Sequence, residues 1–247
     1  MKKRLFFLLF CLCSYNTLHA QLPVIAVQND DAPQFFTVLE EAIDYAEDGD
    51  TLYLPGGSFL LMSEIDKELH FVGAGHYPDS ASGGIITKII GNVYLTSGAD
   101  SCSFEGLYLD AIILANGSGY TNFISLSGLD IIRCSFDGIT LGGSYSNANN
   151  DDNNVRNIYI TECVLRNEIQ GKNAKSVLLE KNIFTAPIRN FNGSVTISHC
   201  IFLSSNAIVS CSGLMVNNSI FHSDDYVYSY TENCTFNNSV FVYDFSS

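Results

Sequence analysis

Positive charge is scarce in this chain of 247 residues, which has 12 lysine and arginine residues against 26 aspartate and glutamate residues. Three of the basic residues are Lys2, Lys3 and Arg4, so the chain after residue 20 has 9 basic and 26 acidic residues, a net charge of −17. Nucleic acids and anionic membranes bind clustered lysine and arginine, so this composition argues against both partners. The negative charge of the chain would also repel an anionic polysaccharide, unless a local basic row or a bound cation offsets that repulsion.

Long apolar runs are also missing, since no segment approaches the roughly 20 apolar residues that a membrane-spanning helix needs. The longest one near the start, Leu5 to Leu12, follows the basic residues and precedes Leu18-His19-Ala20, which ends in a small residue suited to cleavage. This is the pattern of a secretory signal peptide, and the leader resembles those of bacterial proteins. We therefore predict a signal peptide over residues 1–20, a single domain over residues 21–247, and a secreted or cell-surface protein.

Helical periodicity is rare as well. One segment, residues 37–46, has apolar residues on one face and a capping box formed by Thr37 and Glu40. Short strands are expected at residues 24–27 and 51–54, the second closed by the turn Pro55-Gly56-Gly57. No later segment has a helical period, so the sequence predicts an all-β fold with one short helix.

A pattern of about 19 residues recurs in the second half of the chain. Each copy has an alternating apolar strand, then a small or polar residue, then a large apolar residue two positions later. The small or polar residues are Cys134, Cys163, Asn182, Cys200, Ser219 and Ser239, at spacings of 29, 19, 18, 19 and 20 residues. The large apolar residues are Phe136, Leu165, Phe184, Phe202, Phe221 and Phe241. The longest spacing contains a polar insertion at residues 144–154.

A fixed period of this size places equivalent residues above one another, about 4.8 Å apart, in parallel strands. It predicts a right-handed parallel β-helix solenoid with three short strands per repeat. The large apolar residues stack inside, and the small or polar residues line a bend. Asn182 fits this interior if its amide bonds backbone groups at the bend.

Six cysteines follow the leader, and an even number in an exported protein permits disulfide bonds. However, Cys134, Cys163 and Cys200 occupy one phase of the repeat, as buried small apolar residues do. We expect these three to be buried, unbridged thiols.

Several segments resemble the pectin-lyase-like right-handed β-helix superfamily. They are Glu47-Asp-Gly-Asp-Thr-Leu-Tyr-Leu-Pro-Gly-Gly57, Phe71-Val-Gly-Ala-Gly75, Phe104-Glu-Gly-Leu-Tyr-Leu109 and the repeats themselves, and the likeness covers the chain from about residue 24 to its end. The resemblance implies that the helix at residues 37–46 caps the amino-terminal end of the solenoid. It also implies that many relatives bind or cleave polysaccharides, although a shared fold does not by itself transfer activity.

The residue just before each bend offers a candidate binding row, formed by Arg133, Glu162, Lys181 and His199. Stacked on one sheet face, where relatives that act on sugars commonly have their cleft, these residues are our candidate polysaccharide-binding site. Seven of the nine basic residues after the leader lie between Arg133 and Arg189, which favours an acidic glycan. The alternative is a structural ladder of opposite charges that avoids like-charge stacking.

Asp151 and Asp152, within the asparagine-rich insertion, offer hard oxygen ligands for calcium. A calcium ion there would bridge the protein to a uronate. The alternative is a solvated loop, because runs of Asn and Asp are ordinary loop composition.

Catalytic motifs of the superfamily are missing or out of context. Gly75-His76 is followed by Tyr77 rather than by the glycine of polygalacturonases, no Arg-x-Lys occurs, and the candidate row has one carboxylate. The leading hypothesis is therefore a non-catalytic glycan-binding or cell-surface scaffold module. A pectate-lyase-like polysaccharide lyase, in which Lys181, His199 or Arg133 transfers protons, is the enzymatic alternative, and a purely structural solenoid is the third.

The repeat is still in phase at Phe241, with six residues left and no helix to close the last repeat. An open solenoid end exposes unpaired backbone groups and apolar core. Either residues 226–230 and 242–245 cover this end, or the chain associates end to end, or it is a piece of a longer protein.

Overall fold

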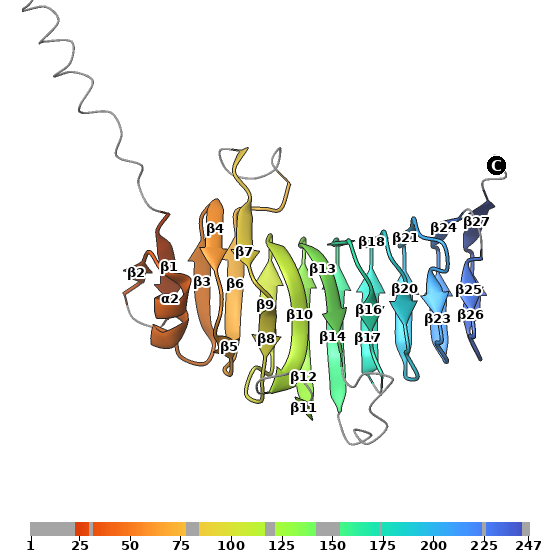
Figure 1. The fold of residues 1–247 in the computed structure, drawn as a ribbon, viewed down its shortest axis with the longest axis horizontal. Coiled ribbons are helices and arrows are strands. Elements are labelled where there is room, and N and C mark those ends of the chain that lie inside the picture. The colour runs from red at the N-terminus through yellow and green to blue at the C-terminus, as the bar shows by residue number, and fades with distance from the viewer. Residues whose placement is uncertain are drawn as a thin grey trace, which may run out of the picture.

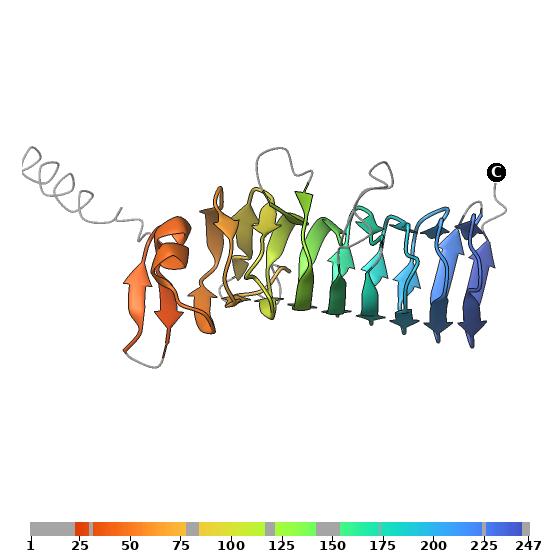
Figure 2. The same cartoon turned by 90° about the horizontal axis from the view of Figure 1, so that it is seen from below.

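The computed structural model describes residues 23–29, 32–77, 84–116, 122–141, 154–172, 174–223 and 226–243. They form an elongated stack of short strands with one helix at the amino-terminal end (Figure 1), and Figure 2 shows the same succession of repeats from a second side. The predicted signal peptide at residues 1–20 lies outside the described residues, as do Asp151 and Asp152. No helix within the described part is long and apolar enough to span a membrane.

The first of two sheets has eleven strands among the described residues. Nine are parallel, and β1 (Ile25–Gln28) and β2 (Gln34–Phe36) close its amino-terminal edge in antiparallel fashion. The parallel strands are β3 (Asp50–Leu54), β6 (Leu69–Gly73), β9 (Cys102–Glu105), β12 (Leu126–Ile132), β14 (Val155–Thr161), β17 (Lys175–Glu180), β20 (Val195–Ser198), β23 (Leu214–Asn217) and β26 (Thr235–Asn237).

The second sheet contains two rows of parallel strands, joined where β10 (Tyr108–Asn116) and β13 (Ser135–Thr140) extend through both. The first row also contains β4 (Gly57–Leu60), β7 (Thr87–Ile90), β15 (Val164–Leu165), β18 (Ile183–Phe184), β21 (Ile201–Phe202), β24 (Ile220–Ser223) and β27 (Val240–Tyr243). The second row also contains β5 (Glu64–Ile65), β8 (Val93–Leu95), β16 (Ile169–Gln170), β19 (Ile188–Arg189), β22 (Ile208–Val209) and β25 (Tyr228–Ser229). A short strand, β11 (Asn122–Phe123), pairs antiparallel with β10.

Six repeats in the described chain have three separate strands, one in the first sheet and two in the second. Each of these strands pairs in parallel with its equivalent in a neighbouring repeat, as β14, β17 and β20 do. The prediction of three short parallel strands per repeat is confirmed in these six repeats, whereas β10 and β13 each form one continuous strand where two were expected. The fold is all-β, and its long parallel sheets are compatible with a β-helix solenoid.

Large apolar side chains form an internal ladder, as the repeat predicted. Strand register aligns Phe136, Leu165, Phe184, Phe202, Phe221 and Phe241 in this order. The rings of Phe184, Phe202 and Phe221 stack with centroids 4.5 and 4.6 Å apart and planes 7° and 6° from parallel. Every member before Phe241 is fully buried. The predicted register is therefore confirmed.

The bend residues form a second internal ladder, linked by hydrogen bonds. The Cys134 N–H donates to Cys163 Sγ (3.3 Å), and the Cys163 N–H donates to Asn182 Oδ1 (2.9 Å). Asn182 Nδ2 donates in turn to the Ile160 carbonyl (2.8 Å), so its buried amide bonds backbone groups as predicted. Because each bend residue accepts an N–H of the preceding repeat, polar atoms are tolerated in this interior.

All six cysteines of the described chain are free, and all except Cys234 are buried. Burial raises the pKa of Cys102 and Cys134 to about 12 and that of Cys200 and Cys211 to about 11. The prediction of buried, unbridged thiols at Cys134, Cys163 and Cys200 is confirmed.

Thiol titration should show this difference in solution. At pH 8, we expect one thiol of the folded chain from residue 21 onward, Cys234, to react quickly with an aromatic disulfide reagent. The others should stay protonated, and the thiolate is the reactive form. Raising the pH to 10 should add little reactivity, because that is still below a pKa of about 11 or 12. Denaturation without reductant should release six thiols, and finding none would contradict the unbridged state.

Helix α2 (Leu39–Tyr45) lies at the amino-terminal end of the stack, with Leu39, Ala42 and Ile43 buried. The predicted capping box is wrong, because the N-cap is Val38, without a side-chain cap bond. The Glu40 carboxylate instead accepts hydrogen bonds from the backbone N–H groups of Met62 and Ser63. At the other end of the helix, Lys67 Nζ donates to the Ile43 and Ala46 carbonyls at 3.0 and 2.8 Å. These contacts attach the helix to the first repeats.

At the carboxyl-terminal end of the described stack, the last repeat is less buried than the repeat before it. Phe241 is partly buried, whereas its partner Phe221 in the preceding repeat is fully buried. Tyr226, Tyr228 and Tyr230 are 68, 53 and 88% exposed, so they are not packed into this opening. Residues 244–247 lie outside the described chain.

Candidate functional site

The four predicted site residues lie on successive repeats, at the corner where the chain passes from the first sheet to the second. The prediction placed them on a sheet face, but each follows the last residue of its first-sheet strand. The equivalent corners of other repeats are Gly106, Asn218 and Asn238, and we call all seven the corner row. Every member has a positive φ, between +48° and +66°. A backbone that must turn sharply within one residue requires this left-handed conformation.

Hydrogen bonds hold the corner row in register. The N–H groups of Arg133, Glu162 and Lys181 donate to first-sheet carbonyls of the next repeat, at 3.0, 3.1 and 2.9 Å. The His199 N–H does the same with the Asn217 carbonyl at 3.1 Å. The side chains of the row therefore project from neighbouring repeats, one above another.

Residue types in the corner row depart from what the backbone favours. Left-handed φ costs about 1–2 kcal/mol for most residues, and glycine, asparagine and aspartate tolerate it best. Among the described residues, 14 other than glycine have positive φ, and nine of these are Asn or Ser. The exceptions are Arg133, Glu162, Lys181, His199 and Tyr230, and histidine is itself tolerated in this region. The backbone therefore does not explain Arg133, Glu162 and Lys181.

Charges in the corner row are paired. The Arg133 guanidinium forms an ion pair with Glu105, the last residue of β9, and Lys181 Nζ lies 3.8 Å from Glu162 Oε1. The alternative of an opposite-charge ladder fits this geometry. The pairs are substantially exposed, so each contributes little to stability. His199 Nδ1 lies 2.7 Å from the Ser198 hydroxyl.

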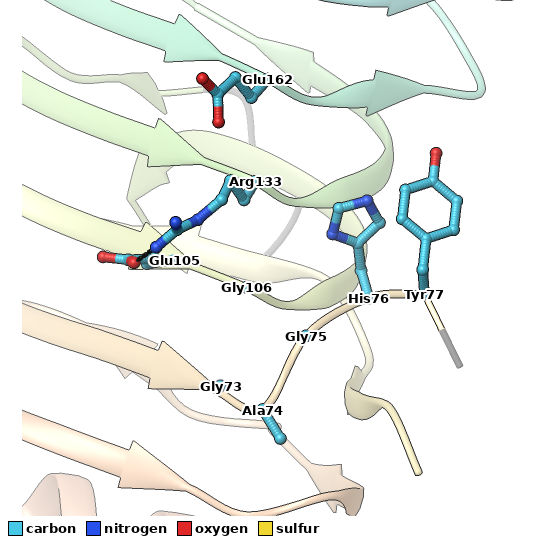
Figure 3. Close-up of a pocket in the computed structure, with 9 residues that line it drawn as sticks. All are labelled: Gly73, Ala74, Gly75, His76, Tyr77, Glu105, Gly106, Arg133 and Glu162. Carbon is cyan, nitrogen blue, oxygen red and sulfur yellow. Dashed lines mark hydrogen bonds and ion pairs between the residues drawn. The ribbon is translucent and has the colours of Figure 1, made fainter. Parts of the chain in front are cut away.

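A pocket of about 390 Å³ opens beside the row, within the usual size range of ligand sites (Figure 3). It brings together Arg133 and Glu162 of the predicted residues, but not Lys181 or His199, which lie on the next two repeats. Its lining is Gly73, Ala74, Gly75, His76, Tyr77, Glu105, Gly106, Arg133 and Glu162.

The pocket exists because one repeat lacks the tight corner. After β6 the chain takes a longer connection before β7 begins at Thr87, and its first residues cross the neighbouring corner at Gly106. The Gly75 N–H donates to the Gly106 carbonyl at 2.9 Å, and the Thr87 N–H donates to the Gly75 carbonyl at 3.1 Å. A Cβ on Gly106 would lie 3.0 Å from the Gly73 carbonyl oxygen. The absence of a side chain at Gly106 thus allows the close approach.

His76 is the residue of this pocket that sequence reasoning missed, because Gly75-His76 was compared only with the polygalacturonase motif. Its Nε2 is buried without a hydrogen-bond partner among the described residues. Burial lowers the pKa of His76, hydrogen bonding to the Arg133 backbone raises it, and the charge of Arg166 lowers it. The imidazole is therefore neutral at neutral pH. Its ring centroid lies 4.1 Å from that of Tyr77, with the planes tilted by 50° (Figure 3).

The arrangement combines hydrogen-bond acceptors, a guanidinium and two rings around a small opening, which suits a polar organic ligand with an apolar face. In the described part of the chain, no three His, Cys, Asp or Glu side chains are grouped to hold a metal ion. The calcium prediction at Asp151 and Asp152 falls outside that part. Comparisons with protein-family models, with curated proteins and with solved structures found no match to this chain.

Proposed function

We propose that this chain is an exported right-handed parallel β-helix protein of the pectin-lyase-like type, and that it binds a glycan, without cleaving it, along the corner row and the adjoining pocket. The observation that carries the proposal is the set of residue types in that row. The favoured residues, glycine and asparagine, occupy its ends at Gly106, Asn218 and Asn238. Charged side chains occupy the three corners after Gly106 despite their conformational cost, and such local strain is typical of functional sites.

The spacing of the row supports a polymeric ligand. Neighbouring repeats are about 4.8 Å apart, close to the length of one sugar unit in an extended polysaccharide. A glycan lying along the stack would meet one polar side chain per repeat. At the pocket, the rings of His76 and Tyr77 offer an apolar surface, and Glu105 and Glu162 accept hydrogen bonds from hydroxyl groups.

The lyase alternative requires a free base beside a neutralised uronate. Arg133 is paired with Glu105, Lys181 lies near Glu162, and His199 stands two repeats beyond Glu162. These pairings favour binding over proton transfer. Incubation with uronate polysaccharides, with and without calcium, tests the alternative and the cation proposed at Asp151 and Asp152, because a lyase releases unsaturated products.

Secretion or surface display and end-to-end self-association through the last repeat belong to the same proposal.

A double substitution of Arg133 and Lys181 by asparagine separates a binding role from a structural one. Asparagine is better suited to the left-handed corner, so we expect the free energy of unfolding to stay constant or to rise by about 1 kcal/mol per site. Affinity for the polysaccharide selected from an immobilised panel should fall by about tenfold or more, because two side chains that donate to the ligand are lost. Chemical denaturation and binding isotherms measure the two effects.

The matched control is Asn233→Lys, which places a lysine at an exposed position that also has a positive φ, +53°, but lies outside the corner row. It should lower stability by about 1 kcal/mol and leave affinity unchanged. Unchanged affinity in the Arg133→Asn, Lys181→Asn variant would remove the corner row from the binding site.

A further inference from the structure

The charges around the pocket are already satisfied by the protein. Among the described residues that line the pocket, Arg133 is the one cation, and its guanidinium is paired with Glu105. The second carboxylate of the lining, Glu162, has its counter-ion Lys181 outside the pocket, at 3.8 Å. Two carboxylates and one guanidinium give the lining a net negative charge.

A further cation whose charge acts on His76, Arg166, is also engaged. Its Nε lies 2.9 Å from Asp137 Oδ1, its Nη1 donates to the Ser135 hydroxyl at 2.9 Å, and its Nη2 donates to the Leu109 carbonyl at 2.8 Å. The guanidinium also stacks over the ring of Tyr108, at 3.7 Å from its centroid. Among the described residues, the cations Arg133, Arg166 and Lys181 are therefore each paired with a carboxylate already.

Hydroxyl groups suit the same lining well. They donate to the Glu105 and Glu162 carboxylates and accept from the remaining N–H groups of Arg133. The imidazole of His76 lines the same pocket, and its buried Nε2 has no hydrogen-bond partner in the described chain. Backbone at Gly73, Gly75 and Gly106 lets a sugar ring approach closely.

We infer that the pocket binds a neutral, hydroxyl-rich sugar unit and discriminates against a uronate. This inference rests on the proposed glycan-binding function and corrects the expectation of an acidic ligand that the clustered basic residues suggested. Four of those seven basic residues pair with neighbouring carboxylates, namely Arg133, Arg166, Lys181 and Arg189. The pocket then selects a neutral sugar because its carboxylates repel the carboxylate of a uronate.

Matched oligosaccharides test the inference. A neutral oligosaccharide and the uronate made from it by oxidising its primary alcohols differ only in charge, and calorimetric titration of the protein measures both affinities. At low salt, we expect the neutral form to bind more tightly than the uronate, by a factor of about ten or more. Its affinity should change little when salt is added, because no ligand charge is involved.

Two variants test whether the pocket carboxylates cause the difference in affinity between the two ligands. Glu162→Gln removes one pocket carboxylate and should narrow the difference between the two ligands, mainly by improving binding of the uronate. Glu168→Gln, outside the pocket lining, removes a carboxylate paired with Arg189 and should leave the ratio unchanged. A uronate that binds as tightly as the neutral form or more so, with affinity weakened by salt, would overturn the inference while leaving glycan binding intact. If neither ligand type binds across a panel of linkages, the proposed function itself is overturned.

Discussion

Replacement of Phe202 by alanine is expected to lower the free energy of unfolding by about 3–5 kcal/mol. The ring is fully buried and lies between those of Phe184 and Phe221, at centroid distances of 4.5 and 4.6 Å. Its neighbours are held in register by parallel strands, so they cannot collapse into the space that the ring leaves. The variant loses both the transfer free energy of the ring and the contacts of the two flanking rings.

Denaturant unfolding measures this loss, provided that the slope of free energy against denaturant stays the same. Ile201→Ala is the matched control, since Ile201 precedes Phe202 on the same strand but is 36% exposed. We expect it to cost less than about 1.5 kcal/mol. Equal costs for the two variants would mean that the aromatic ladder is not the close-packed centre of the fold.

The ladder was predictable because its signal is local and repeated. Phe184, Phe202 and Phe221 recur at nearly one spacing, and each follows its bend residue by two positions. Side chains alternate along a strand, so a fixed phase determines which residues point inward. The bend cysteines followed from the same argument, which is why their burial and free thiols were also expected.

The position of the candidate site could not be predicted in the same way. Arginine, glutamate and lysine do not indicate left-handed backbone, so Arg133, Glu162 and Lys181 were placed on a sheet face instead of at a corner. The partners of Glu40 are distant in sequence, and the capping-box pattern gave no sign of Met62 and Ser63. The pocket likewise depends on tertiary contact between Gly75 and Gly106, which no local pattern encodes.

Replacement of Asn182 by leucine is expected to lower the free energy of unfolding by about 1–3 kcal/mol, although leucine is the more apolar residue. Asn182 is 1% exposed, accepts the Cys163 N–H at 2.9 Å and donates to the Ile160 carbonyl at 2.8 Å. Leucine offers neither group, so a buried N–H and a buried C=O lose their partner in one step. Each such group costs about 1–3 kcal/mol, so the two together cost about 2–6 kcal/mol, against about 1.5–3 kcal/mol gained by burying a leucine side chain.

The neighbouring repeats supply the control, because the equivalent Ser219 accepts the Cys200 N–H through its hydroxyl at 3.2 Å. Asn182→Ser should therefore restore an acceptor for Cys163 and recover about half of the stability lost in the leucine variant. Hydrogen exchange gives a local measurement, since the Cys163 amide should exchange faster in the leucine variant than in the serine variant. If leucine is tolerated at no cost, the bend ladder is an apolar stack, and its hydrogen bonds contribute nothing to the stability of the fold.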